Sequence, residues 1–294
     1  MNDKIKKRVL PLVVMALLFF VGIASILYPL VGNIVAVKTS STVIAQYENE
    51  MENISNDESE EIFKMARDFN DNLFNGILKS SQARCLNRND EIMCYVDVPL
   101  IGVYLPVYYG TSDDVLKKGC GYLENTSLPV GGENTHSVIA GHTGLPTADI
   151  FTKLDEVNIG DVFYIHILHE VLAYKIDKIG TVLPDRTETV NIAPGEDRVT
   201  LLTCTPYGVN DHRLLVSGIR TPYDPEEEKV VELLPQLPQT SNDISKDVVR
   251  QVVVIVIILI IALIVFLIAC AVLWIDNVKR KNVNHTEPKE VQEE

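Results

Sequence analysis

The longest hydrophobic runs lie near the two ends of the chain. Residues 9–31 and 252–274 carry no charged side chain, and each run is as long as a transmembrane helix. Basic residues precede the first run and follow the second, which favours cytoplasmic termini. A cleaved signal peptide is the alternative for the first run, but that run is long for a signal peptide and lacks a clear cleavage site. We therefore expect two transmembrane helices, with cytoplasmic segments at 1–8 and 275–294 and an extracellular region between the helices.

Apolar residues recur at helical spacing after the first run. Steps of three and four residues separate them, and polar residues fill the positions between. Ser55 or Asn56 is a suitable first residue for the helix, because acidic residues follow in its first turn. We predict an amphipathic helix within an extracellular segment at 32–94, packed on the outside of the next domain. The apolar positions are Ile62, Met65, Phe69, Leu73 and Ile77.

From residue 95 the pattern changes to short runs typical of strands, separated by Gly, Pro and Asn. Such strands favour a mainly β domain at 95–221, a barrel or a sandwich, over parallel βαβ units. Two short helices are expected between strands, at 113–118 and 147–154. The expected strands are 95–98, 103–109, 137–140, 162–167, 171–179, 199–203 and 213–219.

The segment that follows, 222–250, contains four prolines and a run of glutamates. This composition predicts an extended tether between the domain and the second transmembrane helix. The net charge of the chain is −14, and its extracellular part has no basic patch. We therefore expect no nucleic-acid partner.

Five cysteines are too few for a disulfide scaffold in a domain of this size. Cys85 and Cys94 are close enough in sequence for a disulfide to close a hairpin, although two free thiols are an equal alternative. Cys120 lies in a predicted turn without a nearby His or Arg in sequence, so it ranks second as a nucleophile.

The stretch 199–220 carries the strongest sign of chemistry. Two strands flank a turn of Pro, Gly, Asn and Asp, so Cys204 should end the first strand and Arg213 should begin the second, facing it across the hairpin. An apolar strand upstream runs into His142, between Gly141 and Gly144. A thiol, an imidazole and a guanidinium supply a nucleophile, an acid or base, and an oxyanion donor.

Each of these residues alone is more often structural, but the three together favour catalysis. His212 is a rival base, although its neighbour Arg213 should face the opposite side of the strand. His136 opens the strand that leads to His142 and is placed near the rim of the site. His166 and His169 lack an identifiable third metal ligand, so we interpret them as residues of a solvated turn.

Two stretches resemble the sortases, cysteine transpeptidases of Gram-positive bacteria, and specifically their pilin-polymerising class C. They read TLLTCTPYGVNDHRLLVSG and, upstream, SLPVGGENTHSVIAGHTGLPTADIFTKLDEVNIGD. The resemblance covers roughly residues 95–220 and implies the eight-stranded sortase barrel. It also implies that Cys204 attacks the Thr carbonyl of an LPxTG-like motif, that His142 protonates the departing glycine amine, and that Arg213 stabilises the intermediate.

The resemblance further implies an acceptor, the lysine side chain of the next pilin subunit. A housekeeping sortase that uses the peptidoglycan precursor is the alternative, and an inert binding module is a less favoured one. Thr203, Thr205 and Val209 are candidates for the sorting-motif groove, and we expect no cofactor and no metal site. Class C sortases usually carry an Asp-Pro-aromatic lid, whereas residues 70–95 contain no Asp-Pro pair.

Overall fold

A computed structural model describes residues 3–77, 84–86, 92–186, 190–226 and 228. The chain divides into two compact units, 1–241 and 242–294, and the second lies wholly outside the described residues. The predicted second transmembrane helix at 252–274, the cytoplasmic tail and most of the predicted tether also lie outside them.

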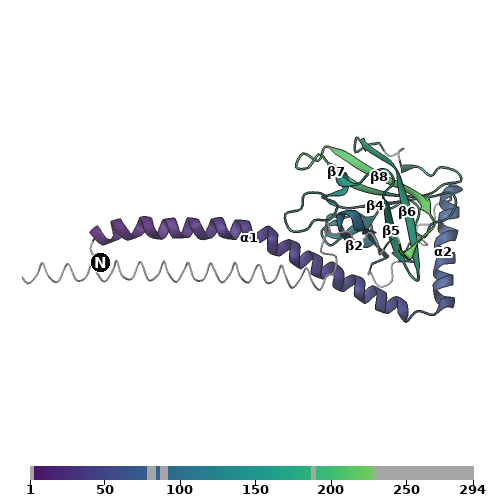
Figure 1. Ribbon diagram of the computed structural model, residues 1–294, viewed down its shortest axis with the longest axis horizontal. Helices are drawn as coiled ribbons and strands as arrows, with labels where there is room; N and C mark the ends of the chain where they lie inside the picture. Colours follow the sequence, from purple (N-terminus) through teal and green to yellow (C-terminus); the bar gives the residue numbers. More distant parts are fainter. Residues whose placement is uncertain (1–2, 78–83, 87–91, 187–189, 227, 229–294) are drawn as a thin grey trace, which may run out of the picture. The chain divides into compact units, whose positions relative to one another are not determined.

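Eight strands form a closed barrel in the order β1-β2-β3-β4-β7-β8-β6-β5 (Figure 1). The sheet is mixed, because β2 pairs with β3 and β4 pairs with β7 in parallel, whereas the remaining pairs are antiparallel. The predicted barrel is therefore confirmed. Its strands are β1 (Cys94–Val98), β2 (Val103–Tyr109), β3 (Cys120–Tyr122), β4 (Thr135–Ala140), β5 (Val162–Ile167), β6 (Glu170–Val182), β7 (Asp197–Thr205) and β8 (His212–Thr221).

Sequence analysis predicted seven of these strands and missed β3. With only three residues, one of them glycine, β3 is too short to show an alternating pattern, and Cys120 lies in it rather than in a turn. The short helix α3 (Asp113–Leu116) lies where a helix was expected. The connecting 3₁₀ helices are η1 (Pro99–Ile101) and η2 (Leu154–Glu156).

The prediction of a helix at 147–154 is wrong. This segment is a loop with bends and turns that leads into η2. Its apolar residues have helical spacing because Ala148, Phe151 and Leu154 are all buried in the barrel core. A loop that inserts separate side chains into a core can thus imitate the period of a helix.

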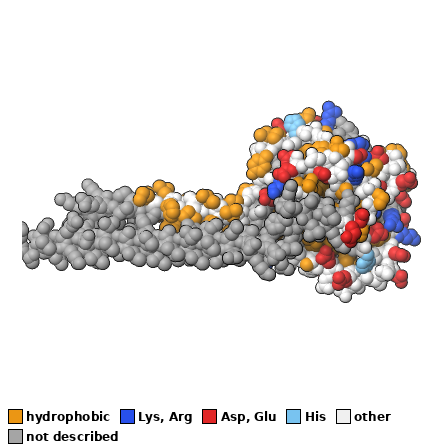
Figure 2. Space-filling model, in the orientation of Figure 1, with side chains coloured by type: hydrophobic (Ala, Val, Ile, Leu, Met, Phe, Trp, Pro, Cys, Tyr) orange, Lys and Arg blue, Asp and Glu red, His pale blue; other side chains and the backbone are white. Residues whose placement is uncertain are grey.

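The helix α1 (Asp3–Glu52) contains the predicted first span but continues well beyond its expected end at Val31. Within the described residues it is the one helix long and apolar enough to cross a membrane. Leu17, Leu18 and Phe19 on this helix are exposed. Figure 2 shows hydrophobic side chains on the surface of its described part. The chain therefore has an N-terminal apolar helix of the membrane-anchor type.

The last turns of α1 pack against the outside of the barrel. Ile44, Tyr47 and Met51 are buried in one small cluster with Ile92 and Tyr95. The phenol of Tyr47 also accepts a hydrogen bond from the Leu168 amide at 2.8 Å. The last turns of α1 are therefore in direct contact with the barrel.

The predicted amphipathic helix is α2 (Asn56–Phe74), which lies beside the barrel in Figure 1. Ser55 caps it by accepting a hydrogen bond from the Glu58 amide at 3.2 Å. Ile62 and Phe69 join the barrel core as expected, whereas Met65 is 40% exposed and Ile77 lies beyond the end of the helix.

Candidate active site

Strands β7 and β8 form the predicted antiparallel hairpin, and Cys204 pairs directly with Arg213. Strand β7 ends one residue after Cys204, and β8 begins one residue before Arg213. Gly208 and Asn210 both have positive φ in the connecting turn, which agrees with the turn signal in the sequence. The thiol and the guanidinium therefore belong to neighbouring strand ends.

His142 reaches the same end of the barrel through the parallel pairing of β4 with β7. The pairing runs from Thr135 opposite Asp197 to Ala140 opposite Leu202. The Gly141 amide then donates to the Leu202 carbonyl at 2.9 Å. His142 follows Ala140 by two residues, and Cys204 follows Leu202, the partner of Ala140, by two residues. The three predicted catalytic residues therefore lie at neighbouring ends of β4, β7 and β8.

Thr203 links the chain just before His142 to the strand that carries Cys204 through a side-chain hydrogen bond. Its side chain is 2% exposed, and its hydroxyl donates to the Gly141 carbonyl at 2.7 Å. A Cβ atom at Gly141 would lie 2.5 Å from the Phe151 ring, so only glycine fits there. The Phe151 amide in turn donates to the His142 carbonyl at 2.9 Å. Both sides of the His142 backbone are therefore held in place.

An acidic side chain that sequence analysis did not single out lies beside His142. Nε2 of His142 is 3.6 Å from Oδ1 of Asp113, at the start of α3. Lys117 lowers the pKa of Asp113 through a hydrogen bond and its charge, and His142 contributes a smaller part. Asp113 is therefore a carboxylate at neutral pH. Only the tertiary fold brings α3 to the end of β4.

The Nε2 atom of His142 is buried and has no hydrogen-bond partner among the described residues. The imidazole side chain as a whole is 28% exposed, and Cys204 is half-buried. A buried polar atom without a partner is unusual in a folded protein. The charged group nearest to this nitrogen is the Asp113 carboxylate, at 3.6 Å.

Arg213 is oriented by the turn that precedes it. Its NH1 group donates to the carbonyls of Asn210, at 3.2 Å, and His212, at 3.0 Å. Nε and NH2 form no hydrogen bond with any described residue and remain available to a ligand. His212 pairs instead with Asp211 at 2.8 Å and is opposite Thr205 in the sheet.

The other described cysteines are unsuitable as nucleophiles. Cys120 and Cys94 are completely buried, and burial raises the pKa of both thiols well above the usual range. Burial also raises the pKa of Cys85 to about 11. Cys85 and Cys94 are free thiols, so the disulfide alternative is not formed. Cys204 is the described thiol at an accessible strand end.

The candidate groove residues have different surroundings. Thr203 is buried, Thr205 is half-buried, and Val209 is 65% exposed on the turn. Sequence analysis missed Tyr207, whose ring is 70% exposed and lies 3.0 Å from the position of a Cβ atom at Gly144. Tyr207 therefore bridges the β7–β8 turn and the loop after His142.

Two other histidines differ from the sequence interpretation. His136 is 3% exposed, and its ring nitrogens contact Thr200 Oγ1 at 2.7 Å and the Asn191 carbonyl at 3.0 Å, so it is a core residue rather than a rim residue. His169 is in an exposed turn as expected. His166 is not, because it lies in β5 with a largely buried side chain.

A thiol, an imidazole and a guanidinium on three adjacent strand ends define a site of the cysteine acyl-transfer class. The domain model "Sortase domain" matches residues 96–221. Sortase A of Streptococcus agalactiae is 26% identical over 126 residues, which cover 42% of this chain and 51% of that protein. Sortase D of Bacillus subtilis is 28% identical over 128 residues, 42% of this chain and 62% of the relative. The match thus spans about half to three fifths of these relatives.

Solved structures give a stronger similarity. Sortase C of Streptococcus pneumoniae is 47% identical with a TM-score of 0.58, covering 62% of this chain and 97% of that one. Sortase C of Clostridium perfringens, described with its C-terminal cell wall sorting motif, is 46% identical with a TM-score of 0.59, covering 63% and 100%. Sortase C1 of Streptococcus agalactiae is 40% identical with a TM-score of 0.61, covering 65% and 100%. The chain belongs to the sortase family.

Proposed function

We propose that this protein is a class C sortase, a membrane-anchored cysteine transpeptidase that assembles pilins. The observation that carries the proposal is the position of His142 just after the end of β4, beside the Cys204–Arg213 pair on β7 and β8. Identities of 40–47% to sortase C structures, against 26–28% to sortases A and D, favour class C over a housekeeping enzyme. An inert binding module would not require the three reactive groups together.

The first half of the reaction cleaves an LPxTG-like motif between Thr and Gly. The Cys204 thiolate attacks the Thr carbonyl carbon and forms a tetrahedral intermediate whose oxyanion Arg213 stabilises. His142 gives its proton to the departing glycine amine as the C–N bond breaks. The acyl group is then held as a thioester on Cys204, and the C-terminal fragment leaves with a neutral amine.

The second half transfers the acyl group to an amine. A lysine side chain of the next pilin subunit attacks the thioester, and His142 accepts a proton from that amine. An amide bond forms, the C–S bond breaks, and the Cys204 thiolate is regenerated. Thr205 and Val209 border the site and would contact the sorting motif, whereas Thr203 acts as a positioning residue through Gly141.

The proposed location follows from the anchor. We propose that α1 and a second helix at 252–274 both cross the cell membrane, with cytoplasmic termini and an extracellular barrel. Substrates that carry a C-terminal sorting signal are also held in the membrane, so anchoring raises the effective concentration at which they meet the site.

Intact-mass measurement after incubation with an LPxTG peptide tests the nucleophile. The native chain should gain the mass of the peptide up to Thr, and Cys204→Ala should gain none. Cys120→Ala is the matched control and should retain the adduct, since Cys120 is buried. An adduct on Cys204→Ala, or none on the native chain, would contradict the proposal.

A competition experiment tests the class. The acyl-enzyme is offered a peptide with a pilin-type lysine and, separately, a peptidoglycan-type amine, and the two products are quantified. Faster transfer to the lysine peptide supports the class C function. A preference for the peptidoglycan-type amine would indicate the housekeeping function instead.

A further inference from the structure

A second cluster of reactive side chains lies on the outer surface of the barrel, away from the catalytic strand ends. Strands β1 and β5 are antiparallel, with Asp97 opposite Tyr164 and Tyr95 opposite His166. Alternate residues point to opposite faces, so these four side chains share one face. Val96 and Ile165, at the intervening positions, belong to the barrel core. Asp97 and His166 therefore project outwards.

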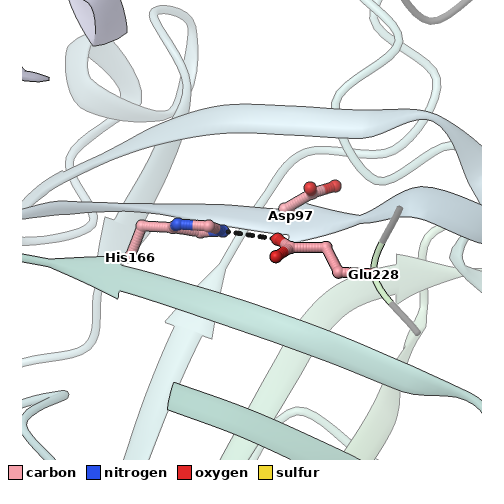
Figure 3. A group of neighbouring side chains, drawn as sticks. All are labelled: Asp97, His166 and Glu228. Atoms are coloured by element: carbon pink, nitrogen blue, oxygen red, sulfur yellow. Dashed lines mark ion pairs between the residues drawn. The ribbon is translucent and has the colours of Figure 1, made fainter. Parts of the chain in front are cut away.

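The chain that leaves β8 covers this outer face. Tyr223 packs edge-on against Tyr164, with ring centroids 5.9 Å apart. Glu228 then reaches His166, with Oε1 3.3 Å from Nε2 (Figure 3). The beginning of the predicted tether therefore lies against the barrel. Its Glu228 carboxylate lies beside Asp97 on β1 and His166 on β5.

Asp97, His166 and Glu228 converge on one point. One donor atom from each residue lies within 4.8 Å of the other two. Figure 3 shows the Asp97 and Glu228 carboxylates on the same side of the imidazole, with Nε2 of His166 directed towards Glu228. Stacking on Tyr95, at 4.4 Å between centroids and 7° between planes, fixes the orientation of the ring.

The three side chains are largely shielded from water. Asp97 is 8% exposed, and the side chains of His166 and Glu228 are 16% and 12% exposed. Nε2 of His166 is fully buried and makes no hydrogen bond with any described residue. Buried carboxylates and imidazoles are commonly paired or bound to a metal. A divalent cation at the point where the three donor atoms meet would bind both carboxylates and Nε2 together.

We infer that Asp97, His166 and Glu228 bind a divalent transition-metal ion, with zinc as the best match. An imidazole nitrogen with two carboxylate oxygens is a donor set that zinc accepts, and water completes a four-coordinate site. Calcium and magnesium prefer oxygen ligands, so the imidazole selects against them. Sequence analysis expected no metal site because the third ligand belongs to a segment that reads as a tether.

The site ties the start of the C-terminal segment to β1 and β5. Since the three ligands come from three separate parts of the chain, metal binding would fix where that segment leaves the barrel. The inference is independent of the proposed function, because none of the three ligands belongs to the catalytic strand ends.

Zinc binding by the untagged full-length chain in detergent tests the inference. Cys204→Ala serves as the parent, because it removes the thiol and imidazole pair as a competing zinc site. After treatment with EDTA and dialysis against zinc, elemental analysis should find one zinc per chain. Zinc should also raise the melting temperature, and magnesium at the same concentration should not.

Single substitutions in this parent identify the ligands. Asp97→Asn, His166→Gln and Glu228→Gln should each weaken zinc binding at least tenfold, whereas His169→Gln, in the exposed turn nearby, should bind as the parent does. Glu228 lies after the last strand, so Glu228→Gln leaves the barrel intact and remains informative if the strand variants fail to fold. Zinc binding unchanged in Glu228→Gln, or absent from the parent, would overturn the inference, and the latter result would indicate a protonated His166 that bridges the two carboxylates.

Discussion

The two ends of strands β4, β7 and β8 carry similar polar side chains but use them differently. At one end, Arg198 donates to Asp177 at 2.6 and 2.9 Å and to Glu196 at 2.8 Å, and His136 has partners at both ring nitrogens. At the other end, Nε2 of His142 is buried without a hydrogen bond to any described residue, and its charged neighbour is Asp113 at 3.6 Å. Satisfied polar groups hold the strands together, whereas unsatisfied ones are left for a substrate.

The largest effect on rate is expected at the end that carries His142, Cys204 and Arg213, which we call the open end. Arg213→Ala should lower the rate of acyl-enzyme formation about 100- to 1000-fold, the range for loss of an oxyanion donor. Its melting temperature should change little, because both hydrogen bonds of Arg213 are made to its own turn. The measurement is single-turnover kinetics beside a thermal melt.

Arg213→Lys is the matched control and should recover only part of the rate, since lysine lacks the planar fork of donors. A rate for Arg213→Ala close to that of the native protein would show that Arg213 is not the oxyanion donor.

Substitutions at the end that carries Arg198 and His136, which we call the satisfied end, should lower the stability of the protein rather than the rate of acyl-enzyme formation. Arg198→Met should lower the free energy of unfolding by about 2–3 kcal/mol, below the usual range for breaking a buried ion pair because both carboxylates are about one-third exposed. Chemical denaturation measures the change. Acyl-enzyme formation by the folded fraction should stay within about twofold of native, and a rate loss as large as that of Arg213→Ala would remove the distinction between the two ends.

Thr203 lies near the open end but is fully satisfied, so it should affect both properties modestly. Thr203→Val removes the hydroxyl that donates to Gly141 and should cost about 1–2 kcal/mol of stability. A looser His142 should also slow acylation by about 3- to 10-fold. Thr203→Ser keeps the hydroxyl and should restore most of the rate, whereas equal losses in both variants would indicate packing rather than the hydrogen bond.

The smallest expected effect is a pH dependence at the satisfied end. Burial, the largest cause, holds the pKa of His136 below its ordinary value of 6.5. The unfolded chain therefore binds a proton below about pH 6.5 that the folded chain does not, and stability falls as the pH is lowered through that value. The loss between pH 7 and 5.5 should be no more than about 1 kcal/mol.

His136→Gln should flatten this part of the stability profile, and the exposed His169→Gln should not. Denaturation at a series of pH values provides the comparison. An equally steep profile in His136→Gln would assign the proton uptake to another group. Asp177 and Glu196 have lowered pKa values and would act only at more acidic pH.

Most of the barrel could be predicted because the residues that indicate a strand are close together in sequence. Short apolar and β-branched runs between turn formers revealed seven strands, whereas β3 has only three residues and forms no such run. The loop at 147–154 was mistaken for a helix because its buried residues happen to have helical spacing. The spacing of apolar residues indicates which positions are buried. It does not by itself decide whether a helix, a strand or a loop buries them.

The candidate site divides in the same way. Cys204 and Arg213 were predictable as a facing pair because a short turn fixes the register of a hairpin. The contact of Asp113 with His142, and that of Glu228 with His166, had no local signal. These pairs depend on where distant segments cross the barrel.

The sequence by itself determined the apolar anchor, most of the strands and the chemical character of the catalytic residues, because each depends on neighbours along the chain. Only the tertiary structure decided that β4 runs parallel to β7, which places His142 beside Cys204. It also decided that the chain after β8 returns to β1 and β5 with Glu228. Parallel pairing and barrel closure join segments far apart in sequence, and local periodicity carries no information about which segments will meet.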